Sequence, residues 1–143
     1  MTDGRLNDLG SIRRIEAPFH EAPNGDLSVF EGGAAVPFTI ARVFVVRAGV
    51  GAVRGMHAHR ECAQLMTCPS GSIEVECDDG VAKETFVLDR PNVALLVPAG
   101  IWAQETYREP HSVLTVLCDR PYVADDYIRN YDDFKSYRQG GAR

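Results

Sequence analysis

Two histidines separated by a single residue lie in the stretch GAVRGMHAHREC, residues 51–62. On an extended strand, side chains two positions apart point to the same face, so His57 and His59 would share one face and Ala58 would take the other. Neutral imidazoles placed in this way can remove and return protons near neutral pH, or bind a metal ion. The pair is therefore an acid/base centre, half of a metal site, or two ordinary strand residues.

The chain that positions this pair has the pattern of short β-strands. Apolar runs are separated by Gly, Pro, Asn and Asp at intervals of about eight to twelve residues, which is typical of an all-β domain. The segment IEVECDDGVAKETFVLD predicts a hairpin, because its apolar residues alternate and Asp79-Gly80 suits a tight primed turn. Further strands are predicted in GDLSVFEGG, FTIARVFVVRAGVG, VALLVPAGIWAQETY and SVLTVLCDRPYV.

The C-terminal segment changes this period. In DDYIRNYDDFKSYR the aromatic residues Tyr127, Tyr131 and Phe134 are spaced like one face of a helix, and we expect that face to pack on the core. The length of 143 residues suits a single domain spanning the whole chain. We divide it into an N-terminal strand segment over about 10–35, a core barrel over about 36–120 and a helical tail over about 123–138.

Composition and charge exclude several classes of protein. The hydrophobic fraction of 45% and the charged fraction of 24% are those of a soluble globular domain. The net charge of −5 offers no basic field for a nucleic acid or an anionic membrane. No apolar run approaches the roughly 20 residues that span a bilayer, and the start of the chain lacks the layout of a signal peptide. We expect a cytoplasmic protein with buried, unpaired thiols at Cys62, Cys68, Cys77 and Cys118.

Many short antiparallel strands in one small domain imply a double-sheet jelly roll or a related barrel, because closure or sheet pairing hides strand edges. The cupins belong to this class, and their first motif combines a Gly, a His-x-His pair, a Glu and a second Gly. The sequence resembles this motif at Gly51, His57, His59, Gln64 and Gly71. The predicted fold is an all-β, single cupin-type jelly roll with a short C-terminal helix.

The metal ligands of that motif are incomplete. Gln64 stands in place of the carboxylate, and Ala103 stands where a third histidine would follow the turn at Pro98-Ala-Gly100. Transition-metal sites generally use three or four nitrogen, oxygen or sulfur ligands in a defined geometry. We therefore expect no metal and no other cofactor.

Three longer stretches resemble a narrower family. RGMHAHRECAQLMTCPSGSIEVECDDG, FVLDRPNVALLVPAGIW and SVLTVLCDRPYVADDYIRNYDDF are similar to the nucleotide-sugar 3,4-ketoisomerases, the WxcM-like or FdtA-like branch of the cupins. The resemblance implies a metal-free enzyme that moves the keto group of a dTDP-4-keto-6-deoxyhexose from C4 to C3 through an enediol. It also implies a homodimer in which N-terminal strands are exchanged.

The resemblance assigns the acid/base role to His57 and His59, without deciding which of them removes the C3 proton. Arg54 is a candidate donor to the enolate oxygen, with a solvated charge at a strand end as the alternative. Arginine forks suit the diphosphate of the dTDP-linked keto sugar, and an aromatic face suits its base. The expected substrate-binding residues are Arg42, Arg47, Gln64 and Trp102, although Trp102 is equally well explained as a core residue.

Two departures from the family keep other functions open. Ala103 leaves empty a position that is often polar or histidine in the family, and Phe44 stands where a tyrosine is usual. The first alternative is a non-catalytic cupin that binds a nucleotide sugar, although it would not need the two histidines. The second is a metal-dependent cupin enzyme, which Ala103 disfavours.

Overall fold

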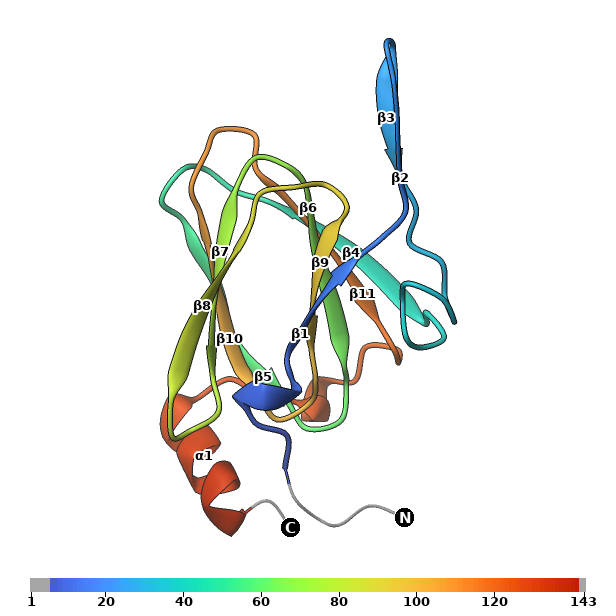
Figure 1. The fold of residues 1–143 in the computed structure, drawn as a ribbon. Helices are drawn as coiled ribbons and strands as arrows, with labels where there is room; N and C mark the ends of the chain where they lie inside the picture. Colours follow the sequence, from blue (N-terminus) through green and yellow to red (C-terminus); the bar gives the residue numbers. More distant parts are fainter. Residues whose placement is uncertain (1–5, 142–143) are drawn as a thin grey trace.

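Residues 6–141 are described by the computed structural model, which contains two five-stranded sheets and a separate two-stranded hairpin (Figure 1). The first sheet has the order β1-β9-β6-β11-β4 and the second the order β12-β5-β10-β7-β8, with antiparallel pairing throughout the registers. The two sheets face each other across the core. The predicted all-β jelly roll is confirmed.

The strands alternate between the sheets along most of the chain, as expected for a jelly roll. The first sheet is formed by β1 (Arg13–Glu16), β9 (Val93–Val97), β6 (Gln64–Ser70), β11 (Val113–Cys118) and β4 (Arg42–Arg47). The second is formed by β12 (Tyr127–Ile128), β5 (Val53–His59), β10 (Trp102–Tyr107), β7 (Ile73–Asp78) and β8 (Lys83–Leu88). The separate hairpin consists of β2 (Phe19–Ala22) and β3 (Gly25–Ser28).

The core lies between the sheets and follows the alternation of each strand. In the predicted hairpin β7–β8, Ile73, Val75 and Cys77 are completely buried while Glu74 and Glu76 between them are half-buried. Burial of these apolar side chains stabilises the two-layer arrangement and fixes the strand register. All four cysteines are buried and free, as predicted.

The N-terminal segment is divided between the sheet and the separate hairpin. Strand β1 pairs with β9, so the barrel includes residues before the predicted start at about 36. The hairpin β2–β3 projects away from the two sheets, and its apolar side chains Phe19 and Leu27 are exposed by 37% and 58% (Figure 1). Within residues 6–141, both side chains are left substantially open to solvent.

The predicted helical tail is wrong in its first half. A 3₁₀-helix over Ala124–Asp126 leads into β12, which pairs with the end of β5. The α-helix α1 occupies only Tyr131–Ser136, where the side chain of Asn130 caps it by accepting a hydrogen bond from the Asp133 backbone nitrogen. Pairing with β5 satisfies the preceding backbone in an extended conformation, so this segment has no need of a helix. A π-helical turn over Tyr137–Gly141 follows α1.

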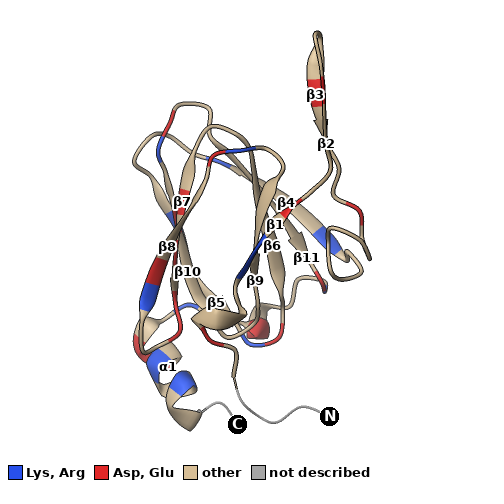
Figure 2. Ribbon diagram, in the orientation of Figure 1, with Lys and Arg blue, Asp and Glu red and all other residues tan. Residues whose placement is uncertain are grey.

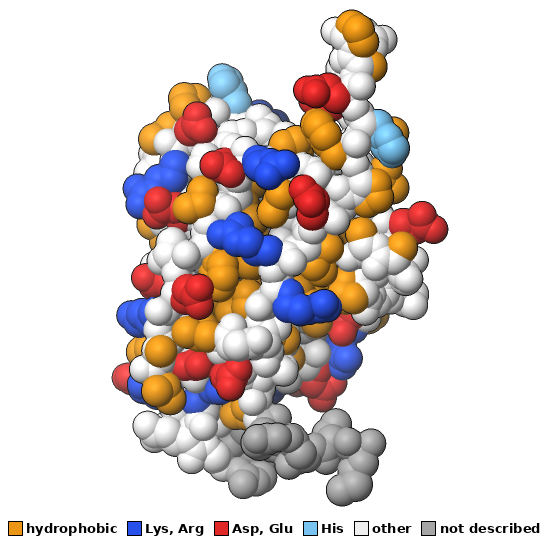
Figure 3. All heavy atoms as spheres, viewed as in Figure 1, with side chains coloured by type: hydrophobic (Ala, Val, Ile, Leu, Met, Phe, Trp, Pro, Cys, Tyr) orange, Lys and Arg blue, Asp and Glu red, His pale blue; other side chains and the backbone are white. Residues whose placement is uncertain are grey.

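Charges of both signs are distributed over the strands and loops (Figure 2). On the face seen in Figure 3, acidic and basic side chains are interspersed with hydrophobic ones and no single sign dominates. Within residues 6–141, no helix has the length and apolar character required to cross a membrane.

The two glycines that bound the histidine motif provide a matched test of this fold. Gly51 and Gly71 both have a φ of +85°, but a Cβ at Gly71 would lie 2.6 Å from the Ser112 Cα, whereas a Cβ at Gly51 would meet nothing within 4 Å. We expect Gly51→Ala to cost about 1 kcal/mol of stability from strain alone. Gly71→Ala should cost about 3 kcal/mol, because a backbone clash is added to the strain. Urea unfolding measures both values, and equal losses would contradict the close approach at Gly71.

Candidate active site

A cavity of about 230 Å³ lies between the two sheets and receives side chains from both. The first sheet contributes Arg42, Phe44, Val46, Gln64, Met66 and Val116 to its lining. The second sheet and the residue after β12 contribute Arg54, Gly55, His57, His59, Ala103, Glu105, Tyr127 and Arg129. The lining from the first sheet is therefore mostly apolar, with Arg42 and Gln64 as its polar residues, whereas the other side is rich in titratable groups.

A β-bulge in β5 brings Arg54 and His57 to the same cavity although they are three residues apart. Gln104 on β10 pairs with Gly55 and the adjacent Ala103 pairs with His57, so Met56 is an extra residue in β5. Gly55 and Met56 both have positive φ angles, of 87° and 54°. A bulge of this kind changes which side chains face inward. Without it, regular alternation would direct Arg54 away from the histidines.

His57 is held in the neutral state with its lone pair free for chemistry. Its Nδ1 lies 3.0 Å from the carbonyl oxygen of Gly55, so this nitrogen donates the hydrogen bond and Nε2 carries the lone pair. Burial, together with the neighbouring His59, lowers the pKa of His57 to about 4. The two imidazole ring centroids are 5.0 Å apart. At neutral pH the His57 ring is therefore a proton acceptor.

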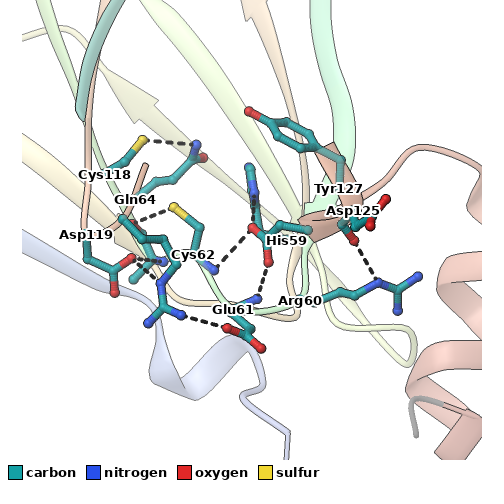
Figure 4. Close-up of polar contacts among 12 residues, drawn as sticks. His59, Arg60, Glu61, Cys62, Gln64, Cys118, Asp119, Asp125 and Tyr127 are labelled. Atoms are coloured by element: carbon teal, nitrogen blue, oxygen red, sulfur yellow. Dashed lines mark hydrogen bonds and ion pairs between the residues drawn. The ribbon is translucent and has the colours of Figure 1, made fainter. Parts of the chain in front are cut away.

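His59 has a different partner, a carboxylate from the C-terminal segment. Its Nδ1 lies 2.8 Å from Oδ2 of Asp126. The same carboxylate accepts hydrogen bonds from the backbone nitrogens of Glu61, at 2.7 Å, and Cys62, at 3.3 Å (Figure 4). Burial lowers the pKa of His59, and the hydrogen bond to Asp126 opposes this effect. Its Nε2 is buried and has no hydrogen-bond partner among residues 6–141.

Tyr127 packs against both imidazoles and also contacts the two arginines at one end of the cavity. Its ring centroid lies 4.3 Å from that of His59 and 5.0 Å from that of His57. Figure 4 shows Tyr127 beside His59. Its hydroxyl accepts a hydrogen bond of 3.2 Å from Arg42, and the Arg129 guanidinium lies 4.3 Å from the Tyr127 ring centroid. Two arginines and an aromatic ring thus lie together beside the histidine pair, which suits an anionic ligand.

The sequence and the fold are similar to those of known proteins. The family model FdtA, described as WxcM-like, C-terminal, matches residues 9–139 of the chain. The chain belongs to this family. One curated relative is the TDP-4-oxo-6-deoxy-alpha-D-glucose-3,4-oxoisomerase of Aneurinibacillus thermoaerophilus. It is 37% identical over 114 residues, which are 79% of this chain and 82% of that protein.

Solved structures of sugar 3,4-ketoisomerases share the fold of this chain over nearly their full length. A sugar 3,4-ketoisomerase from Thermoanaerobacterium thermosaccharolyticum, solved in complex with TDP, has a TM-score of 0.89 at 27% identity and covers 94% of this chain and 98% of that one. A variant of the same enzyme was solved with TDP-4-keto-6-deoxyglucose. The TDP-quinovose 3,4-ketoisomerase of Campylobacter jejuni has a TM-score of 0.82 at 30% identity and covers 89% and 98% of the two chains.

The positions of the cupin metal motif do meet in this WxcM-like protein. Gln64 and Ala103 line the same cavity as the histidines, and Gln64 donates to the Cys118 sulfur at 3.7 Å. The ligand atoms of His59, Cys62 and Asp126 also lie within 4.8 Å of one another. The hydrogen bond with the Cys118 thiol, together with burial, raises the pKa of the Cys62 thiol. These three residues instead form part of the hydrogen-bond network around Asp126.

Two of the predicted substrate-binding residues lie elsewhere. Trp102 faces the opposite side of β10 from Ala103 and packs on Tyr131 and Phe134, with ring-centroid separations of 5.2 and 5.5 Å. It is a buried packing residue beneath α1 and does not line the cavity. Arg47 follows the exposed face of β4 and lines a separate hollow beside His111. Strand alternation explains both corrections.

The other expected residues, His57, His59, Arg54, Arg42 and Gln64, line the cavity together. Sequence reasoning missed Tyr127, Arg129, Asp126 and Glu105. The first three belong to the segment DDYIR, for which the spacing of the aromatic residues predicted a helix. The charged residues on either side of its tyrosine were the feature of the sequence that could have indicated a site. Glu105 was hidden in an ordinary strand pattern, where a single polar residue at an inward position was the only indication.

The low pKa of His57 has a measurable effect on stability. Between about pH 6.5 and 4 the unfolded chain binds a proton at this residue that the folded chain does not, so acidification destabilises the fold. When the pH is lowered from about 7 to 4.5, the free energy of unfolding should fall by about 2 kcal/mol less for His57→Asn than for the wild type. Urea unfolding at the two pH values measures the difference. His20→Asn, on the exposed strand β2, controls for removal of an imidazole, and parallel wild-type and His57→Asn profiles would contradict the assignment.

Proposed function

We propose that the protein is a sugar 3,4-ketoisomerase of deoxysugar biosynthesis that converts a dTDP-linked 4-keto-6-deoxyhexose into its 3-keto isomer. The observation that carries this proposal is the pair of imidazoles facing one cavity, each with Nδ1 held by an acceptor. The 37% identical relative is named for the same reaction, and a related structure holds the corresponding sugar nucleotide. Family and geometry thus support the same chemistry.

The reaction needs a base and a proton donor close to two adjacent carbons. The proton on C3 is acidic because it is α to the C4 carbonyl, and its removal gives an enediol with a C3=C4 double bond. Return of a proton to C4 then leaves the carbonyl at C3. A positioned side chain typically contributes about 10² to 10⁴ in rate to each proton transfer.

The surroundings of the two imidazoles suggest which of them takes part in each transfer of a carbon-bound proton. His57 is the half-buried ring of the pair, so we assign it the first contact with the C3 proton. His59 is buried, and the Asp126 carboxylate stabilises positive charge on its ring. We therefore assign His59 the role of second acid/base partner. Arg54 lines the same cavity and is placed to stabilise the enolate oxygen.

The size and charge of the cavity suggest the pose of the substrate. Its volume of about 230 Å³ lies below the roughly 300–1,000 Å³ typical of sites for drug-sized ligands, so we place the hexose inside and the nucleotide beyond the mouth. Arg42 and Arg129 then meet the diphosphate. Tyr122 is exposed by 54% and its ring lies 5.4 Å from that of Tyr127, so it offers the aromatic face that we expected from Trp102.

Four free thiols are consistent with a reducing compartment, and we propose that the enzyme acts in the cytoplasm. This location fits a sugar-nucleotide substrate, because such compounds are made and consumed by intracellular enzymes.

Both histidines should be needed for turnover and neither for nucleotide binding. We expect His57→Asn and His59→Asn each to lower kcat by about 10² or more while the Kd for dTDP stays almost unchanged, since Asn keeps polarity but is not a useful base. The double variant should be little worse than the more damaged single one, because the pair acts as a unit. His111→Asn, on an exposed turn, is the matched control. A wild-type protein that binds the nucleotide sugar but neither exchanges its C3 proton with D₂O nor forms a 3-keto product would instead be a binding module.

We also propose a homodimer, for which the exposed apolar surface is the support. Strand β4 lies at the edge of its sheet, and its outward side chains Val43 and Val45 are exposed by 54% and 57%. The projecting hairpin β2–β3 adds the exposed Phe19 and Leu27. Unprotected edges and apolar patches of this kind are usually covered by a partner. We expect light scattering to give twice the chain mass of 15.7 kDa, and a monomer at micromolar concentration would contradict the proposal.

A further inference from the structure

Glu105 is a buried acid in the lining of the cavity. It is the second inward-facing residue of β10, between Ala103 and Tyr107, and it is only 6% exposed. Within residues 6–141 its carboxyl group forms no hydrogen bond and no ion pair. A buried carboxyl group without a partner destabilises a fold, so its presence needs another explanation.

The backbone of β5 leaves space for this carboxyl group. A Cβ at Gly55 would lie 2.6 Å from Oε2 and 2.9 Å from Oε1 of Glu105, so the carboxyl group covers this glycine. The carbonyl oxygen of the same glycine accepts the hydrogen bond from His57 Nδ1. Glu105 therefore lies against the peptide that orients His57, and both side chains open into one cavity.

The groups around Glu105 leave it able both to donate and to accept a proton. Arg54 from β5 is the cation that faces it, and the neutral groups near it are Cys77 from β7 and Tyr107 from its own strand. Burial raises the pKa of Glu105 to about 7, although Arg54 acts in the opposite direction. Near neutral pH the acid and its conjugate base are both populated.

The proposed isomerisation requires more than the movement of a carbon-bound proton. When the carbonyl moves from C4 to C3, the oxygen on C4 must gain a proton and the oxygen on C3 must lose one. The proposed function assigns the histidine pair to the protons on carbon, and a guanidinium such as that of Arg54 donates hydrogen bonds without transferring a proton. A separate acid with two accessible protonation states fits this need.

We propose that Glu105 is the catalytic residue that carries the oxygen-bound proton, giving it to O4 in the first half of the reaction and taking it from O3 in the second. This inference rests on the proposed function and deepens it. In the first half, the C3–H electron pair forms the C3=C4 bond, the imidazole takes the proton, and the C4=O4 π pair takes the proton of the Glu105 acid. In the second half, C4 takes the proton from the imidazolium, the O3–H pair forms the C3=O3 bond, and the Glu105 carboxylate takes the released proton. Both side chains return to their starting states.

Replacement by glutamine separates the two halves of the reaction. Glu105→Gln donates a hydrogen bond to O4 but cannot transfer a proton to it or accept one from O3. We expect exchange of the C3 proton with D₂O to stay within about tenfold of the wild type, while formation of the 3-keto product falls about 10²-fold. Glu76→Gln is the matched control, because Glu76 is a half-buried acid on the outer face of β7.

The possible outcomes distinguish failure of the role of Glu105 from failure of the proposed isomerase function. A wild-type enzyme with neither exchange nor product would overturn the proposed function itself. If the wild type is active but Glu105→Gln retains both rates, or loses both equally with its thermal midpoint unchanged, the proton-carrying role is wrong. An increased ratio of exchange to product supports it, since a merely structural role would not change that ratio.

The pH dependence provides a second, independent measurement. In the first half the side chain at position 105 must donate to O4, which the acid and the glutamine amide can do and the carboxylate cannot, so kcat/KM of the wild type should fall as the pH rises through about 7. Glu105→Gln should lack this alkaline limb, and its persistence in the variant would overturn the proposal. If the variant does not fold, the wild-type profile alone decides, and a flat profile between about pH 6 and 8 would be the contrary result.

Discussion

The contact between Asp126 and His59 is the interaction on which the rest of the site depends. One carboxylate holds the imidazole at 2.8 Å and also accepts hydrogen bonds from two backbone nitrogens of the loop after β5. Hydrogen bonds to a charged group are each worth about 1.5–3 kcal/mol, so this single side chain fastens the C-terminal segment to the second sheet. Because β12 follows directly, the same attachment brings Tyr127 over both imidazoles and Arg129 to the cavity. The histidine pair, the aromatic ring and the two arginines are therefore one assembly.

The strands and the histidine pair were predictable because they depend on local periodicity. The hairpin β7–β8 has the alternation and the Asp79-Gly80 turn that determine its register, and His57 and His59 share a face for the same reason. Alternation also explains why Arg42 faces inward and Arg47 does not. Arg54 does line the cavity, but its inward position depends on the extra residue in β5, which no rule of alternation anticipates.

The rest of the site depends on contacts between distant parts of the chain. Tyr127 was placed on a helix because its spacing from Tyr131 and Phe134 fits one, yet pairing with β5 keeps it extended. Trp102 and Ala103 are neighbours, and only the position of α1 shows that the tryptophan is the covered residue and the alanine the cavity residue. Burial of Glu105 likewise requires the packing of β5 and β7 against β10. Such long-range pairings override local propensity and are not recorded in any short window of sequence.

The pairing of β12 with β5 also affects the order in which the protein becomes competent. The main apolar core between the two sheets includes no residue of β12, so the sheets can form before the segment that contains Asp126 and Tyr127 docks. Until that segment docks, His59 lacks its carboxylate and the cavity lacks one wall. The barrel is therefore a scaffold that can form before its active site, and the imidazoles meet their partners only when β12 docks.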